Sequence, residues 1–187
     1  MFNNHYFNVL TTAHALVMIF FFLIPSLISR FGNILVPLYC RVPDIAFPRI
    51  NNLSYWLIFP AILMLLIRSI IERGAGCRWT VYPPLSSFGH RSASVDAAIF
   101  SLHLARAASI IGGINFITTI LMFSVRGSDF YNVPVFVWAM FTTVFLLVLS
   151  LPVLAAGITI LLFDRNLNTS FFDSERRGDA VLFQHLF

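Results

Sequence analysis

Residues 134–163 read PVFVWAMFTTVFLLVLSLPVLAAGITILLF, a run without a charged side chain. A helix needs about 20 mostly apolar residues to cross the hydrocarbon core of a bilayer, so this run is long enough for one crossing. Three further apolar stretches reach a similar length. The sequence therefore predicts an all-α, polytopic transmembrane helix bundle in a single membrane domain. Its parts are four spanning helices at 7–39, 50–71, 93–123 and 134–163, and a tail at 164–187.

The composition supports a protein that is solvated mainly by membrane lipid. Hydrophobic residues make up 58% of the chain and charged residues only 11%, whereas about a quarter of a soluble domain is charged. All twelve basic residues are arginines, scattered along the chain without a basic block or stripe. This distribution predicts no nucleic-acid partner. Arginines near both ends of the predicted helices leave the membrane orientation open.

One histidine, His14, lies inside the first apolar stretch. An ionisable side chain at membrane depth indicates a functional site, and neutral imidazole is the commonest metal ligand. The small alanines on either side leave room for a flat macrocycle. A histidine that is hydrogen-bonded to a neighbouring helix would explain the residue equally well. His103, in the third stretch, is a weaker candidate of the same kind.

Polar side chains also occur at or inside the ends of the predicted helices. They are Asn33, Asn51, Ser109 and Asn115, and the carboxylate of Asp44 lies in the first connection. Such groups can hold chains of water, with a carboxylate at the mouth to collect protons. Ordinary helix capping and interhelical hydrogen bonding would use the same residue types, so both interpretations stay open at this point.

Several stretches, in fixed order along nearly the whole chain, resemble subunit I of the haem–copper oxidases, in particular mitochondrial cytochrome c oxidase. They are TAHALVMIFF (12–21), FPRINN (47–52), WTVYPPL (79–85), SVD (94–96), IFSLHL (99–104), INFITT (114–119), LPVLAAGIT (151–159) and DRNLNTSFFD (164–173). Members of this family have a dozen transmembrane helices. The chain resembles the second to the fifth of them, together with the loop that leads to the sixth.

The resemblance implies roles for individual residues. His14 would be one of the two axial ligands of haem a, and its iron would be the metal held by this chain. Trp79 and Tyr82 would lie near the haem propionates. The proton pathway would enter near Asp44, Asn33 and Asn51 and continue past Ser109 and Asn115. The intact family subunit also holds a second haem and one copper, but we expect the copper ligands and the oxygen-reducing centre to lie outside this chain.

The resemblance also implies an activity, a location and partners. Electrons would pass from cytochrome c through subunit II to haem a and the haem–copper centre, where oxygen is reduced to water while protons are pumped. We expect a multi-pass protein of the mitochondrial inner membrane that assembles with subunits II and III and is inactive by itself. A quinol oxidase of the same superfamily and a non-catalytic membrane fragment are the alternatives.

Six arginines stand where this family typically has glycine. They are Arg30, Arg41, Arg78, Arg106, Arg176 and Arg177. The family also continues with tryptophan where this chain ends at Phe187. We hypothesise that a mitochondrial reading frame was decoded with the standard code, which reads AGA and AGG as Arg and UGA as a stop. The alternative is a divergent, split subunit in which the arginines are real.

Overall fold

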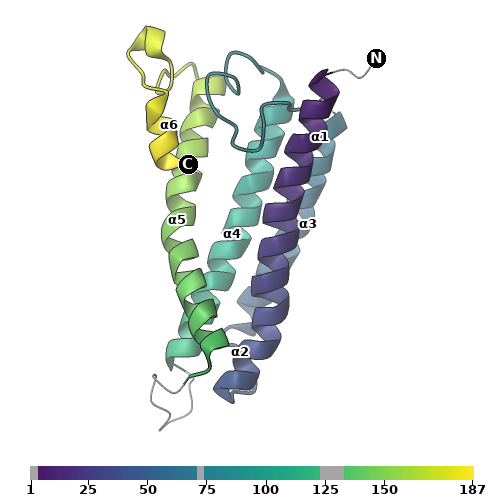
Figure 1. The fold of residues 1–187 in the computed structure, drawn as a ribbon, viewed down its shortest axis with the longest axis vertical. Coiled ribbons are helices and arrows are strands. Elements are labelled where there is room, and N and C mark those ends of the chain that lie inside the picture. The colour runs from purple at the N-terminus through teal and green to yellow at the C-terminus, as the bar shows by residue number, and fades with distance from the viewer. Residues whose placement is uncertain (1–3, 71–73, 123–132) are drawn as a thin grey trace.

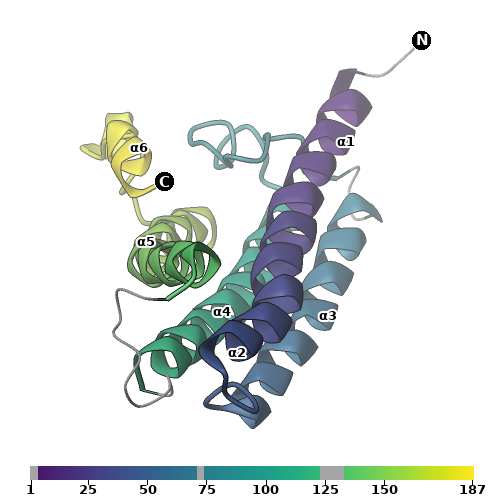
Figure 2. The same cartoon turned by 60° about the horizontal axis from the view of Figure 1, so that its bottom comes forward.

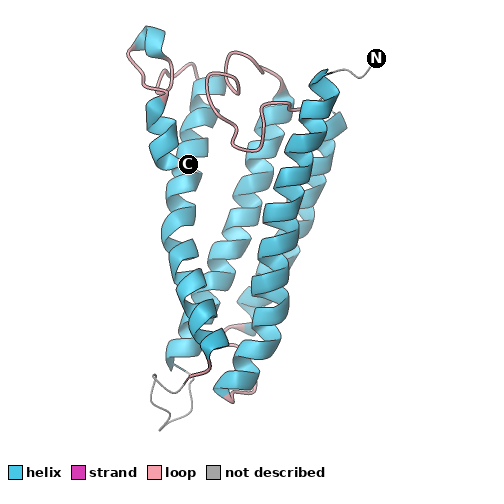
Figure 3. Ribbon diagram, in the orientation of Figure 1, coloured by secondary structure: helices cyan, strands magenta, loops and turns pink. Residues whose placement is uncertain are grey.

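The structure, a computed structural model, describes residues 4–70, 74–122 and 133–187 (Figure 1). Within these ranges every regular element is a helix (Figure 3). Four helical spans are long and apolar enough to cross a membrane, at Asn4–Cys40, Pro48–Ser69, Ala93–Met122 and Val135–Asn166. The predicted all-α membrane bundle is therefore confirmed. The predicted end residues 71 and 123 lie outside the described residues, and the division into a single membrane domain stays a prediction.

The first span consists of four helical segments that follow one another without a loop. They are α1 (Asn4–Leu16), the π-helical segments η1 (Val17–Leu23) and η2 (Pro25–Gly32), and α2 (Asn33–Cys40). The widened turns meet at Pro25, whose ring removes a backbone N–H donor. The preceding residue, Ile24, donates its N–H to the carbonyl oxygen of Ile19, five residues back. Pro25 thus lies where the two π-helical segments meet, and the first span stays helical through it.

The long helix α4 (Ala93–Met122) lies between α3 (Pro48–Ile70) and α5 (Val135–Asn166) and packs along both (Figures 1 and 2). Small residues on α4 permit this close packing, as is common between membrane helices. A Cβ atom on Gly113 would lie 3.0 Å from Val148 Cγ2 on α5. On the other side, the Ser101 hydroxyl donates to the Ala61 carbonyl of α3 over 2.6 Å. Both α3 and α5 continue as helix through their internal prolines, Pro60 and Pro152.

The connections gather at the two ends of the bundle. The 41–47 connection lies at the lower end in Figure 1, and the 74–92 connection and the tail lie at the upper end. Residues 126–129, which read RGSD and separate the third and fourth apolar stretches, lie outside the described residues. The fourth helix continues to Asn166 rather than ending at 163, and the tail contains the short segments η5 (Ser174–Arg176) and α6 (Val181–Leu186). These two segments were not predicted.

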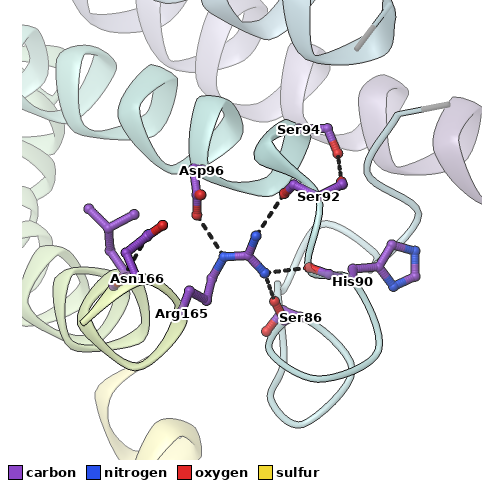
Figure 4. A network of polar contacts seen from close by, with 8 residues as sticks. Ser86, His90, Ser92, Ser94, Asp96, Arg165 and Asn166 are labelled. Carbon is purple, nitrogen blue, oxygen red and sulfur yellow. Dashed lines mark hydrogen bonds and ion pairs between the residues drawn. The ribbon is translucent and has the colours of Figure 1, made fainter. Parts of the chain in front are cut away.

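The upper end is held together by Arg165 at the end of α5 (Figure 4). Its Nε donates to the Asp96 carboxylate of α4 over 2.6 Å, and the side chain of Arg165 is only 3% exposed. Its Nη atoms donate to the carbonyl oxygens of Ser86, of His90 at 2.5 Å and of Ser92 at 2.7 Å. One guanidinium therefore joins α4, α5 and the 74–92 connection, and donates to three carbonyl groups of that connection.

We predict that Arg165→Gln destabilises the upper end by about 3 kcal/mol, because it leaves the Asp96 carboxylate and three carbonyl groups without their cationic partner. Hydrogen exchange of the backbone amides in the 74–92 connection should become faster. The matched control is Arg91→Gln, since the Arg91 side chain is exposed and lies over the Phe88 ring at 5.7 Å. Equal exchange rates in the two variants would contradict the assigned role of Arg165.

Candidate functional site

His14 lies on an outward, apolar face of α1. Its side chain is exposed and makes no hydrogen bond or ion pair with the described part of the chain. The exposed neighbours on this face are Phe7 (61%), Leu10 (48%), Val17 (40%) and Met18 (42%). They stand at spacings of seven, four, three and four residues from His14, which place them on the same side of a helix. The face is thus an apolar stripe with an imidazole near its centre.

The other histidines do not form a metal-ion site with His14. The ring of His103 faces α5, where its Nε2 lies 3.4 Å from the Thr159 hydroxyl. The rings of His5 and His90 stack with centroids 5.6 Å apart. Across residues 4–70, 74–122 and 133–187, no three His, Cys, Asp or Glu side chains gather closely enough to hold a metal ion. His14 is therefore not part of a metal-ion cluster among the described residues.

Trp79 and Tyr82, which the resemblance places near the haem propionates, both contact the C-terminal segment. The rings of Trp79 and Phe187 lie 5.8 Å apart. The Tyr82 hydroxyl accepts a hydrogen bond from Gln184 Nε2 over 2.8 Å. Neither aromatic residue forms a hydrogen bond or ring contact with His14. The structure thus places Trp79 and Tyr82 against the C-terminal residues 184–187, and neither contacts the imidazole.

The start of the 74–92 connection is packed against α1. A Cβ atom on Gly76 would lie 3.2 Å from ring atoms of His5, and Cys77 is buried in one core cluster with Leu16 of α1. Burial raises the pKa of the Cys77 thiol, an effect that the nearby Arg68 cation reduces without reversing. The thiol is therefore neutral at physiological pH, and the connection is fixed beside the helix that carries His14.

A cavity of about 590 Å³ lies between the first span and α3, towards the lower end of the bundle, and its surface is mainly apolar although several of its lining side chains are polar. Two of its lining residues meet there, because Asn33 Nδ2 donates to Asn51 Oδ1 over 3.3 Å. The Oδ1 atom of Asn33 is buried and has no hydrogen-bond partner in the described chain. Buried polar atoms are nearly always paired with protein or water. The unpaired acceptor of Asn33 therefore marks this region as a candidate polar site.

A second, smaller cavity of about 20 Å³ continues inward towards α4 and has room for about one water molecule. Ser109 of α4 lines this inner cavity, whereas Ser29 and Ser54 line both cavities. Polar side chains therefore run from Asn33 and Asn51 past two serines to Ser109. Ser54 was noted in the sequence only as a polar residue, and Ser29 was missed, although its position four residues before Asn33 places both on one helix face.

The 41–47 connection, which carries Asp44, is fixed by α4. Asn115 Oδ1 accepts the backbone N–H of Phe47 over 2.9 Å, and Asn115 Nδ2 donates to the Phe47 carbonyl over 3.1 Å. The Thr119 hydroxyl accepts the N–H of Ala46 over 2.9 Å. Asp44 is exposed and lines neither cavity. Both polar atoms of the Asn115 amide thus bond to the connection. Asn115 does not line the cavity that Ser109 lines.

The fold and these sites define a multi-span helical membrane protein with an outward imidazole and an internal polar path. A family model described as Cytochrome C and Quinol oxidase polypeptide I matches residues 1–187. Curated relatives named cytochrome c oxidase subunit 1 are 53% identical over 186 residues in Yarrowia lipolytica and 50% identical over 186 residues in Candida albicans. A relative of the same name in Eremothecium gossypii is 49% identical over 185 residues.

The chain belongs to the cytochrome c and quinol oxidase polypeptide I family. The alignments cover 98–99% of this chain but 35% of each relative. The chain therefore spans about a third of the length of the curated relatives that it matches.

We predict that Asn115→Leu lowers the free energy of unfolding by about 2 kcal/mol, because the variant removes the acceptor of the Phe47 N–H and one of the two donors to the Phe47 carbonyl. The measurement is unfolding of the membrane-inserted chain by titration with SDS. Thr118→Val is the control, since the Thr118 hydroxyl is exposed and donates only to the Ile114 carbonyl of its own helix. A loss no larger than that of the control would show that Asn115 does not hold the connection.

Proposed function

We propose that this chain is part of the catalytic subunit of a terminal respiratory oxidase, which takes electrons from cytochrome c, reduces oxygen to water and pumps protons. The match of the family model to residues 1–187 supports this proposal. The names of the relatives support cytochrome c rather than quinol as the donor. The proposed location is the mitochondrial inner membrane, with subunits II and III as partners. The observation that carries the proposal is the exposed imidazole of His14 on its apolar stripe.

We propose His14 as an axial ligand of haem a. A haem presents a flat apolar ring and an iron that accepts imidazole nitrogen, and the stripe offers exposed apolar side chains on both sides of one unpaired imidazole. When bound, the haem would supply one-electron transfer. The protein's part is to present the His14 ring from the outward face of a packed helix. The second haem, the copper and the other ligand of haem a would be held by the part of the subunit that lies outside this chain.

We propose the two joined cavities as part of a proton pathway. Asn33 and Asn51 supply amide groups at the wide cavity, and Ser29 and Ser54 line the wall that both cavities share. The hydroxyl of Ser109 donates to the Ala105 carbonyl over 3.0 Å and keeps its oxygen lone pairs available to water. Asp44 would collect protons at the lower surface. Asn115 would act as a positioning residue, because its amide holds the connection that carries Asp44.

We propose Trp79 and Tyr82 as part of the protein surface near the haem propionates. Their support is the position of the 74–92 connection, which packs against the first turns of α1. Arg165 fixes that connection from the opposite side. A non-catalytic membrane fragment remains the rival from a different class. The haem content of the purified chain distinguishes the two, because a fragment without a cofactor would contain none.

The test of the haem proposal is His14→Ala, introduced into the intact oxidase subunit. We expect the variant to lose the optical absorption of the low-spin haem, because alanine offers no ligand atom to the iron. His185→Ala is the matched control, since this histidine is exposed on α6 and should leave the spectrum unchanged. Subunit assembly should be checked on native gels. An assembled His14→Ala oxidase with an unaltered haem spectrum would refute the assignment.

The test of the pathway proposal is Asn33→Leu in the same intact oxidase. Leucine removes the donor to Asn51 and places an apolar group in the cavity, so proton uptake should slow about tenfold. Uptake is measured with a pH-sensitive dye after a single turnover. Thr142→Val on the exposed face of α5 is the control, because its hydroxyl donates only within its own helix. An uptake rate equal to that of the control would remove Asn33 from the pathway.

A further inference from the structure

Three exposed arginines have a backbone conformation that favours glycine. Arg41, Arg78 and Arg177 have φ angles of +55°, +63° and +68°. Side chains with a Cβ atom rarely adopt this left-handed region, whereas glycine enters it without steric cost. Arg41 directly follows α2, and its N–H donates to the Leu38 carbonyl. This is the position after a helix where glycine is the usual residue.

Nothing in the surroundings of these three side chains offsets the strained backbone. All three are exposed, and none makes a side-chain hydrogen bond or ion pair with the described residues. Two other residues share the conformation. Asn168 is of a type that tolerates left-handed geometry. Val81 is a strained, β-branched exception, but it is only 2% exposed and packs in the core, whereas the three arginines are exposed and have no such packing.

Arg106 is unsuited to its position for a different reason. It lies in the middle of α4, it is 2% exposed, and its Nε, Nη1 and Nη2 atoms all lack a hydrogen-bond partner in the described chain. The aromatic ring of Phe20 is 5.8 Å from its Cζ atom and is a weak partner for a cation. A buried, unpaired charge in a membrane helix is strongly unfavourable.

Arg165 shows how this chain accommodates an arginine that fits. Its side chain is as deeply buried as that of Arg106, but a carboxylate and three carbonyl groups surround it. Arg30 and Arg176 show neither feature that marks the four unsuitable positions. Arg30 has a helical backbone within η2, and Arg176 is exposed and lies 3.7 Å from the Asp173 carboxylate. The structure therefore separates the arginines that fit their surroundings from those that do not.

We propose that positions 41, 78, 106 and 177 are occupied by glycine in the polypeptide that the cell makes, through codons that the standard code reads as Arg. Glycine relieves the backbone strain at three positions and removes the unpaired charge at the fourth. It would also reduce the twelve basic residues to eight, equal to the eight acidic residues. If the proposed proton pathway is correct, glycine at 106 also removes a cation next to Phe20, which lines the inner cavity with Ser109.

The test is mass spectrometry of the native chain from membranes of the cells that carry this gene. Chymotryptic peptides covering positions 41, 78, 106 and 177 should have glycine masses, and trypsin should not cleave after these positions. Arg165 is the internal control and should be found as arginine. Arginine at any of the four positions would overturn the proposal. Glycine at 165 would also overturn the proposal. It would show that unpaired burial and a left-handed backbone do not distinguish the arginine positions occupied by glycine from the others. The readout requires no oxidase activity, so it is independent of the proposed function.

Discussion

The central physical constraint on this chain is that lipid offers no hydrogen bonds, so polar groups within the bundle must find partners inside the protein. Helix formation meets the requirement for most backbone groups, and side chains of α4 meet much of the remainder. Asn115 and Thr119 bind the backbone of the 41–47 connection, and Ser101 binds the Ala61 carbonyl. At the other end, Arg165 donates to carbonyl groups of the 74–92 connection. The central position of α4 follows from these contacts as much as from its small residues.

The places where this requirement is not met are therefore informative. The unpaired Oδ1 of Asn33 belongs to a residue that lines a cavity of about 590 Å³, so the proposed hydrated path passes close to it. The unpaired guanidinium of Arg106 is buried, and the only partner recorded for it among the described residues is the Phe20 ring. The unpaired imidazole of His14 points outward on an apolar face, where a flat ligand or another helix could cover it. Three unpaired groups thus have three different physical explanations.

The sequence predicts the four spans well because long apolar runs leave a chain few alternatives in lipid. The sequence predicts side-chain contacts and short helical segments less well, because these depend on contacts between residues that are distant in the chain. The hydrogen bonds of Arg165 join groups about seventy residues or more apart in the chain. No local sequence pattern predicts these bonds. The π-helical turns around Pro25 and the short helix α6 also went unpredicted. The spacing of four residues between Ser29 and Asn33 places both on one helix face. Only the cavity shows that this face is the one that matters for the proposed path. The roles of the individual site residues stay predictions.

We propose that α1 presents His14 to a haem within a haem–copper oxidase subunit. The most direct measurement is a cryo-electron microscopy map of the intact oxidase at a resolution that separates side chains. We expect continuous density from the His14 ring to the centre of a flat macrocycle lying along the stripe of Phe7, Leu10, Val17 and Met18. A His14 ring that faces lipid or another helix, with no macrocycle beside it, would contradict the assignment of His14 as a haem ligand.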